Sequence, residues 1–325
     1  MHVARLHRPL IVVAGIMAAL AVLTAVGILV DDRTLVGVPI WLKPFKFSVS
    51  IAIYGATIAW MLSLLAERRR RLGWWLGTTI AGAMLLEMVI IIGQAARGHQ
   101  SHFNNQTMLD ARLYNVMGAT IAIAWVATLI LAILLLRQRM PVRADALAVR
   151  LGIIVALGGM AVGFLMTLPT KAQLAQDQLT IIGAHSVGVA DGGPGLPLVN
   201  WSTTGGDLRA GHFIGMHALQ ALPLLAFALT LLARRFTRLR ADRLRARLIA
   251  VAGFGYAGIT VLLTWQALRG QSLVHPDALT LSAAGALLVA TAAGAVWAAG
   301  TRVDPADTAE PIEQPSPAPV QAEAV

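Results

Sequence analysis

Residues 114–136 read YNVMGATIAIAWVATLILAILLL, and the basic stretch RQRMPVR follows directly at 137–143. A helix of about twenty apolar residues crosses the hydrocarbon core of a bilayer, because each residue adds about 1.5 Å along the axis. This stretch therefore predicts a transmembrane helix that ends at a positively charged membrane surface. The same pairing of an apolar run with nearby arginines recurs along the chain.

The composition of the whole chain also indicates a lipid environment. Of its 325 residues, 57% are hydrophobic and 13% are charged, and the mean hydropathy is +0.70. A soluble domain is usually about 25% charged. The chain has no cysteine, which excludes disulfides, thiolate metal sites and a cysteine nucleophile. None of the HExxH, GxSxG and P-loop motifs is present, so no known catalytic motif names a reaction.

Eight runs are long and apolar enough to cross a membrane. They lie at 10–30, 46–65, 72–95, 114–136, 151–170, 212–233, 248–268 and 279–300. The first follows a basic start and is compatible with a signal peptide, but its length and the further spans favour a retained span. We therefore predict an all-α, polytopic transmembrane helix bundle over residues 1–300. Residues 301–325, rich in proline, alanine and acids, are expected to form a disordered cytoplasmic tail.

The lysines and arginines predict the orientation of the bundle. With the amino terminus inside, 18 of these 26 residues fall in cytoplasmic segments, and every cytoplasmic hairpin is basic. Since cytoplasmic loops are enriched in these residues, we expect both termini in the cytoplasm and the chain in the inner (plasma) membrane. The net charge of +10 then reflects topology and contact with anionic heads of the lipid bilayer, not nucleic-acid binding. The bias toward Ala, Arg, Gly and Val is typical of a bacterium with high genomic GC.

Short strings recur in the two halves of the chain. LKPFKF (42–47) matches LRAGHF (208–213), and QAARG (94–98) matches QALRG (266–270). They predict a tandem repeat of two four-helix units, 10–136 and 151–300, related by an axis along the membrane normal. Matches of this length also arise by chance, so chance similarity is the alternative.

Glu87 is the most informative polar residue inside a predicted span. It lies about eight residues from the outer end of the third span, about 12 Å deep. A carboxylate at that depth costs a few kcal/mol unless it is protonated, paired or facing a cavity. We expect a functional role; a structural pair with Lys46 or a histidine is the alternative. Gln94 follows two turns later on the same face, and Arg97 sits at the mouth of the span.

Six of the eight histidines fall on the predicted outer side. His102 would continue the stripe of Glu87 if the helix continued. His212 and His217 are five residues apart, about 140° around a helix, so one regular helix cannot easily present both to one metal. His217 shares a face with Gln220. Glu87, His102, His212 and His217 are the candidate ligands or acid-base groups.

The outer loop 171–211 is far longer than a usual connection, and loops of this kind are functional or disordered. Its glycines and prolines favour tight turns, and Trp201 would anchor it, so we predict an ordered lid over an outer cavity. A flexible linker is the alternative. The predicted binding residues are Lys43, Lys46, Gln94, Arg97, Trp201, Asp207, Arg209 and Gln220.

Three stretches resemble those of a family of uncharacterised bacterial polytopic membrane proteins. They are WLKPFKF (41–47), QAARGHQSHFN (94–104) and the segment 183–223, which ends in HALQALP. The resemblance covers the second to sixth spans and implies an eight-span fold; that family brings no established activity. Haem A synthase is similar in architecture alone, since it has two tandem four-helix units with histidines near the outer face. Its ligand motifs do not map onto this chain.

Three classes of function fit these features. The first is a membrane enzyme or redox protein that holds a divalent metal or haem b, with His102, His212 and His217 as ligands. The second is a transporter or lipid-handling protein for an anionic solute or head group on the outer face. The third is a non-catalytic sensor or assembly partner. The sequence favours them in this order and does not predict the substrate or the oligomeric state.

Overall fold

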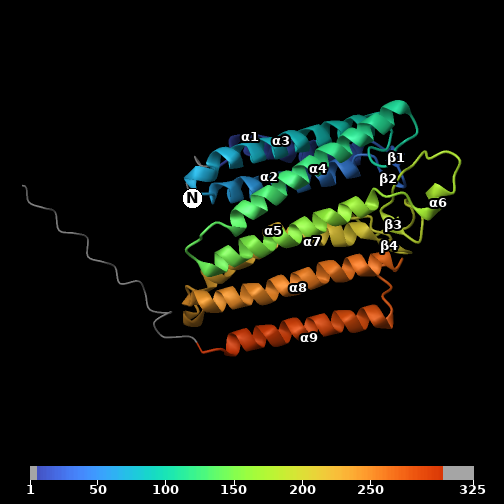
Figure 1. Ribbon diagram of the computed structural model, residues 1–325. Helices are drawn as coiled ribbons and strands as arrows, with labels where there is room; N and C mark the ends of the chain where they lie inside the picture. Colours follow the sequence, from blue (N-terminus) through green and yellow to red (C-terminus); the bar gives the residue numbers. More distant parts are fainter. Residues whose placement is uncertain (1–5, 303–325) are drawn as a thin grey trace, which may run out of the picture.

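The structure is a computed structural model and describes residues 6–302 of the chain. In this part, eight helices are long and apolar enough to cross a membrane, which confirms the predicted all-α, eight-span bundle (Figure 1). These helices are α1 (Arg8–Val30), α2 (Leu42–Ser63), α3 (Glu67–Ala96), α4 (Met108–Leu136), α5 (Arg143–Met166), α7 (Leu208–Leu232), α8 (Asp242–Leu268) and α9 (Ala278–Gly300). The predicted tail lies outside the described residues, apart from Thr301 and Arg302.

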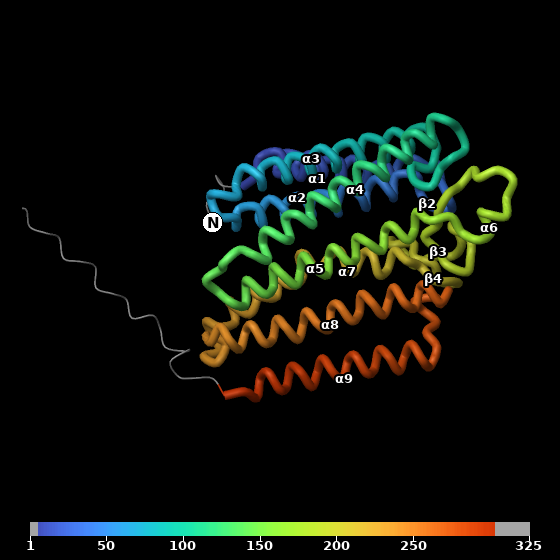
Figure 2. Tube along the Cα trace, in the orientation of Figure 1, coloured from blue at the N-terminus to red at the C-terminus, as the bar shows by residue number. Residues whose placement is uncertain are grey.

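The remaining elements are short and cluster at the ends of the bundle. They are β1 (Thr34–Leu35), β2 (Val38–Pro39), α6 (Lys171–Leu174), β3 (Ser186–Val187), β4 (Gly206–Asp207) and the 3-10 helix η2 (Thr237–Arg240). β1 pairs antiparallel with β2, and β3 pairs antiparallel with β4. Both hairpins and α6 lie at one end of the bundle, which we call the hairpin end (Figure 1). The opposite end, where the described chain starts and finishes (Figure 2), is the arginine end.

Six helices begin four to eight residues before the predicted apolar runs, and side-chain caps start two of them, α4 and α7. Thr107 precedes α4 and accepts a hydrogen bond from the backbone N–H of Asp110. Asp207 precedes α7 and accepts one from the backbone N–H of Arg209. Such caps satisfy N–H groups that a helix leaves without partners at its start. As a consequence, the long loop after α5 ends at Asp207 instead of residue 211.

The helices of the two halves have the same order of neighbours. In the first half, α1 packs against α2 and α3, α2 against α3, and α3 against α4. In the second half, α5 packs against α7 and α8, α7 against α8, and α8 against α9. The principal helix contact between the halves is that of α4 with α5. Each half therefore has its own set of packed helices.

Glycines allow α5 and α7 to approach closely. A Cβ atom added to Gly159 would lie 2.5 Å from the carbonyl carbon of Gly215 and from the amide nitrogen of Met216. A Cβ on Gly152, two turns earlier on the same face, would lie 2.9 Å from the carbonyl oxygen of Ala218. Small residues at this spacing are typical of closely packed membrane helices. This contact sets the position of the start of α7, where the site residues of the second half lie.

Candidate functional site

Glu87 lies on α3 and is 1% exposed. Neither of its carboxylate oxygens has a hydrogen-bond partner among residues 6–302. The imidazole of His102 approaches the carboxylate, with its Nε2 atom 3.5 Å from Oε1. The structure therefore brings Glu87 and His102 together, although α3 ends at Ala96 and His102 does not continue its helical stripe.

The turn after α3 places His102 over Glu87. Gly98 has a φ of +75°, a conformation that glycine adopts without strain, and it ends the helix. The backbone N–H of His99 then donates to the carbonyl oxygen of Gln94 at 2.9 Å. The side chain of Gln94 donates to the carbonyl oxygen of Gln100 at 3.2 Å. These bonds fold the chain back toward the bundle instead of letting the helix continue.

Gln94 and Arg97 belong to this turn and not to a ligand site beside Glu87. The side chain of Gln94 also donates to Asp110 at 2.8 Å, and Arg97 donates to the side-chain Oε1 atom of Gln94 at 2.5 Å and to Asp110 at 3.3 Å. Asp110 is fully buried and accepts a further bond from the hydroxyl of Thr107 at 2.7 Å. The predicted binding residues Gln94 and Arg97 are thus used to hold the loop that carries His102.

Aromatic rings surround the Glu87–His102 pair. The ring of Phe47 meets the ring of His102 edge-on at 5.6 Å, and the ammonium of Lys43 lies 5.8 Å from the Phe47 centroid. Lys43 interacts electrostatically with Glu87 without forming an ion pair. The ring of Tyr114 lies 6.4 Å from His102, and its buried hydroxyl has no partner among the described residues. The result is a polar cluster in an apolar setting.

Arg209 and Asp207 form an ion pair that holds the end of the long loop. The Arg209 guanidinium lies 2.6 Å from the carboxylate of Asp207 and donates to the carbonyl oxygen of Asn200 at 2.5 Å. Asp207 also accepts from the backbone N–H of Ser202 at 2.7 Å. Because Asp207 is buried and its charge is offset by Arg209, neither residue carries a free charge into the site.

Lys46 and Lys43 have different surroundings although they lie one turn apart on α2. Lys46 donates to the carbonyl oxygen of Val199 at 3.2 Å and so ties the long loop to α2. Lys43 makes no hydrogen bond or ion pair with another residue in the described part of the chain. It interacts electrostatically with Lys46 and Arg209, and we call these three residues, at the starts of α2 and α7, the three-cation group.

The long loop contributes a histidine–aspartate pair. The Nδ1 atom of His185 lies 3.0 Å from Asp191, which also accepts from the backbone N–H groups of His185 and Ser186 at 2.9 and 2.8 Å. Burial lowers the pKa of His185, and it holds the pKa of His102 well below its usual range. Burial opposes ionisation of Asp191, but the hydrogen bonds from His185 and Ser186 and the charge of His185 together lower the pKa of Asp191.

His212 contacts a neighbouring helix, and His217 contacts Gln220 on its own helix, α7. The Nδ1 atom of His212 lies 2.8 Å from the carbonyl oxygen of Gly159 on α5. The Nδ1 atom of His217 lies 3.2 Å from Gln220, whose amide donates to Thr57 on α2 at 3.1 Å. Among residues 6–302 no group of three or more His, Asp or Glu side chains is placed to hold a metal ion. This arrangement gives no support to a metal held by His102, His212 and His217.

The loop between α5 and α7 is folded against both halves of the bundle. The backbone N–H of Ile182 donates to the carbonyl oxygen of Phe103 at 2.8 Å, which joins this loop to the one that carries His102. The ring of Phe103 packs edge-on against His185 at 4.8 Å. Trp201 meets the ring of Phe213 on α7 at 5.9 Å. These contacts fit the predicted ordered lid better than a flexible linker.

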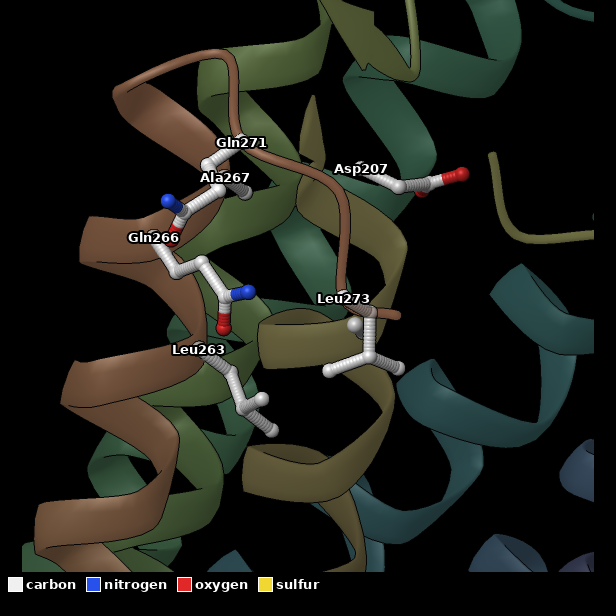
Figure 3. Close-up of a pocket in the computed structure, with 7 residues that line it drawn as sticks. Asp207, Leu263, Gln266, Ala267, Gln271 and Leu273 are labelled. Carbon is white, nitrogen blue, oxygen red and sulfur yellow. The ribbon is translucent and has the colours of Figure 1, made fainter. Parts of the chain in front are cut away.

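Neither Glu87 nor His102 lines the two hollows found at the hairpin end. The first has a volume of about 10 Å³, about the space of a single water, and Figure 3 shows Gln266, Gln271 and Asp207 around it. The second, of about 220 Å³, is mostly apolar. It is lined by Leu165, Leu168, Pro169, Thr170, Ala184, Ser186, Val187, Leu208 and Leu268. Of the predicted site residues, Asp207 alone lines either hollow.

Three residues near the site were not predicted from the sequence. Phe47 lies four residues after Lys43, a spacing that places both on one helical face, and this signal was available. Tyr114 opens an apolar run, where a tyrosine usually marks the membrane surface. His185 pairs with Asp191, which lies six residues later in an irregular loop. No regular spacing predicts that pairing.

The fold and this cluster define a multi-pass membrane protein with a buried polar site toward one end of its helix bundle. Comparisons of the chain with protein-family models, with curated proteins and with solved structures found no match. Its function is therefore inferred from its own side chains and their geometry.

Proposed function

We propose that the protein binds an anionic solute or lipid head group at the hairpin end, as part of transport or lipid handling. Lys43 carries this proposal. It is the member of the three-cation group that has no hydrogen bond or ion pair with another residue between positions 6 and 302. Lys46 is bound to Val199, and Arg209 is paired with Asp207. Lys43 is therefore the cation left available for an anion.

The surroundings of Lys43 favour a negative charge. The starts of α2 and α7 bring the positive ends of two helix dipoles to the hairpin end. Trp41, which precedes α2, supplies no side-chain hydrogen bond to the first N–H groups of that helix. The nearby charge of Lys46 adds to the positive potential. In a setting with little water, such a potential attracts anions more strongly than it would in solution.

The two halves of the bundle support a repeat, which we propose as the origin of this arrangement. Besides sharing the order of helix neighbours, α3 and α8 end in the same way. Gln94 donates to the carbonyl oxygen of Gln100, and Gln266 donates to that of Ser272, each six residues further on. Gly98 and Gly270 follow with φ values of +75° and +70°. Parallel repeats of this kind occur in transporters.

The arginines support an outward-facing site. The loops at the arginine end hold the larger share of the positive charge, so we propose that this end faces the cytoplasm. The hairpin end, with Lys43, then faces the extracytoplasmic side of the plasma membrane. An anion would reach the site from outside the cell.

A metal ion or haem b was the first class predicted from the sequence, and the geometry fits it less well. A metal ion needs several donors directed at one point, and residues 6–302 offer no such set. The anion site is therefore the better-supported proposal. A haem absorption band, or stoichiometric metal in the purified protein, would restore the cofactor hypothesis.

Sulfate binding tests the proposal, because sulfate is a small dianion with oxygens like those of a phosphate head group. Purified protein in neutral detergent is titrated with sulfate by calorimetry. A hydrogen bond to a charged group contributes about 1.5–3 kcal/mol, so Lys43→Met is expected to weaken binding about 10- to 150-fold. Lys171→Met is the matched control, because Lys171 is an exposed lysine on α6 at the same end.

A competition experiment distinguishes a soluble anion from a lipid head group as the ligand. Competition of sulfate with phosphatidylglycerol in mixed micelles indicates a head-group site, and lack of competition indicates a soluble anion. Equal sulfate affinities of wild type, Lys43→Met and Lys171→Met, or no binding by the wild type, would contradict the proposal.

A further inference from the structure

We infer that an anion bound at Lys43 causes Glu87 to take up one proton, so that the site binds an anion and a proton together. This inference rests on the proposed anion site and adds a second ligand to it. It arises from Glu87, a buried carboxyl group whose oxygens accept no hydrogen bond among residues 6–302, and from the ammonium of Lys43, which interacts with it electrostatically.

Glu87 has little to stabilise a negative charge. Its side chain is 1% exposed, and neither oxygen accepts a hydrogen bond from any residue in the described range. An ionised carboxylate without partners is costly in a membrane interior, whereas a neutral carboxylic acid is much less so. The positive charge of Lys43 is the nearby charge that offsets a negative Glu87. The ionised form therefore depends on Lys43.

An anion bound at Lys43 removes this stabilisation of the ionised Glu87. Its negative charge cancels most of the field of Lys43 at Glu87, so the neutral acid becomes the more stable form. A proton from water at the hairpin end then binds a carboxylate oxygen of Glu87, and the added charge of the anion is partly balanced. Because linkage is reciprocal, protonation of Glu87 strengthens anion binding by the same factor.

The groups that face Glu87 from the neighbouring elements are consistent with this role. They are Lys43 on α2, His102 in the loop after α3, and Tyr114 on α4. Asp110, also on α4, is engaged by Gln94 and Thr107. α1 packs against α3 but has no titratable side chain between residues 9 and 30. Lys43 is thus the strong charge in this group.

His102 offers the proton a route to Glu87. Its Nε2 atom lies 3.5 Å from Glu87 Oε1, and its side chain is 21% exposed, so it reaches toward the surface while Glu87 does not. Imidazole can accept a proton on one nitrogen and release one from the other. His102 is therefore placed to pass protons between the hairpin end and the buried carboxyl group.

Calorimetry with sulfate tests the coupling, because sulfate stays a dianion between pH 5 and 8. Titrations in two buffers of different ionisation enthalpy give the number of protons taken up per sulfate bound. We expect up to one proton for the wild type, and a dissociation constant that rises by up to tenfold per pH unit where uptake is complete. Glu87→Gln is expected to bind sulfate with no proton uptake at this group and a correspondingly flatter pH profile.

Glu67→Gln is the matched control, since Glu67 lies exposed at the other end of α3. The Glu67→Gln variant should take up as many protons per sulfate bound as the wild type. Sulfate binding with equal proton uptake in wild type and Glu87→Gln would overturn the inference and leave the anion site standing. Absence of sulfate binding by the wild type would instead overturn the anion site itself. If Glu87→Gln is poorly folded, Glu87→Asp replaces it in the test. Because Glu87→Asp keeps the carboxyl group, it must retain the proton uptake on sulfate binding.

Discussion

Gly159 provides a test of the packing that positions α7. In Gly159→Ala, the added Cβ would lie 2.5 Å from the backbone of Gly215 and Met216, a distance at which the helices must move apart. The same movement stretches the contact of His212 Nδ1 with the Gly159 carbonyl oxygen, now 2.8 Å. Overpacking of this kind costs about 1–3 kcal/mol.

Gly158 supplies the control, because a Cβ at this neighbouring position meets nothing within 4 Å. Both substitutions gain about the same helix propensity, so their difference isolates the steric cost. We therefore expect Gly159→Ala to unfold with a free energy about 1–3 kcal/mol lower than Gly158→Ala. The assay is reversible unfolding in mixed micelles with increasing SDS, followed by circular dichroism. Equal stabilities of the two variants would refute the close contact of α5 with α7.

Two further predictions concern orientation and pH. Because the chain has no native cysteine, single cysteines report sidedness cleanly. An impermeant maleimide should label Gln178→Cys in intact cells and Arg139→Cys only after lysis; the reverse pattern would contradict the proposed orientation. Burial lowers the pKa of His102 and of His185, so the unfolded chain binds protons first and stability falls as pH drops below about 6.5. The loss is at most about 1.4 kcal/mol per pH unit for each histidine, and His102→Gln should reduce it. An unchanged slope in that variant would contradict this assignment.

The eight spans could be predicted because each depends on hydropathy, a property that is local in sequence. An apolar run such as that of α4 must be helical in lipid, where backbone groups have no water to bind. The helix starts were placed too late because caps such as Thr107 and Asp207 are polar and look like loop residues. Hydropathy alone carries no signal for such caps.

The site was predicted less completely, because its contacts join distant parts of the chain. Depth in a span was enough to single out Glu87, and the structure supplied His102 as its neighbour. Gln94 and Arg97 contact Asp110, which lies in the next helix, and this contact separates them from the Glu87–His102 pair. Nothing in the sequence spacing indicates that pairing, so the sequence predicts a binding role for both residues and does not predict their contacts with Asp110.

The proposed repeat explains why such a site would occur once in the bundle. With the offset of the α2 and α7 strings, Lys43 corresponds to Arg209; with the offset of the α3 and α8 strings, Glu87 corresponds to Ile259. The second unit thus has a cation, but Asp207 neutralises it, and the position of the carboxylate holds an apolar residue that is 45% exposed. The first unit has Lys43, which forms no ion pair among residues 6–302, and Glu87, whose oxygens accept no hydrogen bond there. Divergence of the two units would therefore have left a binding site in one and a structural ion pair in the other.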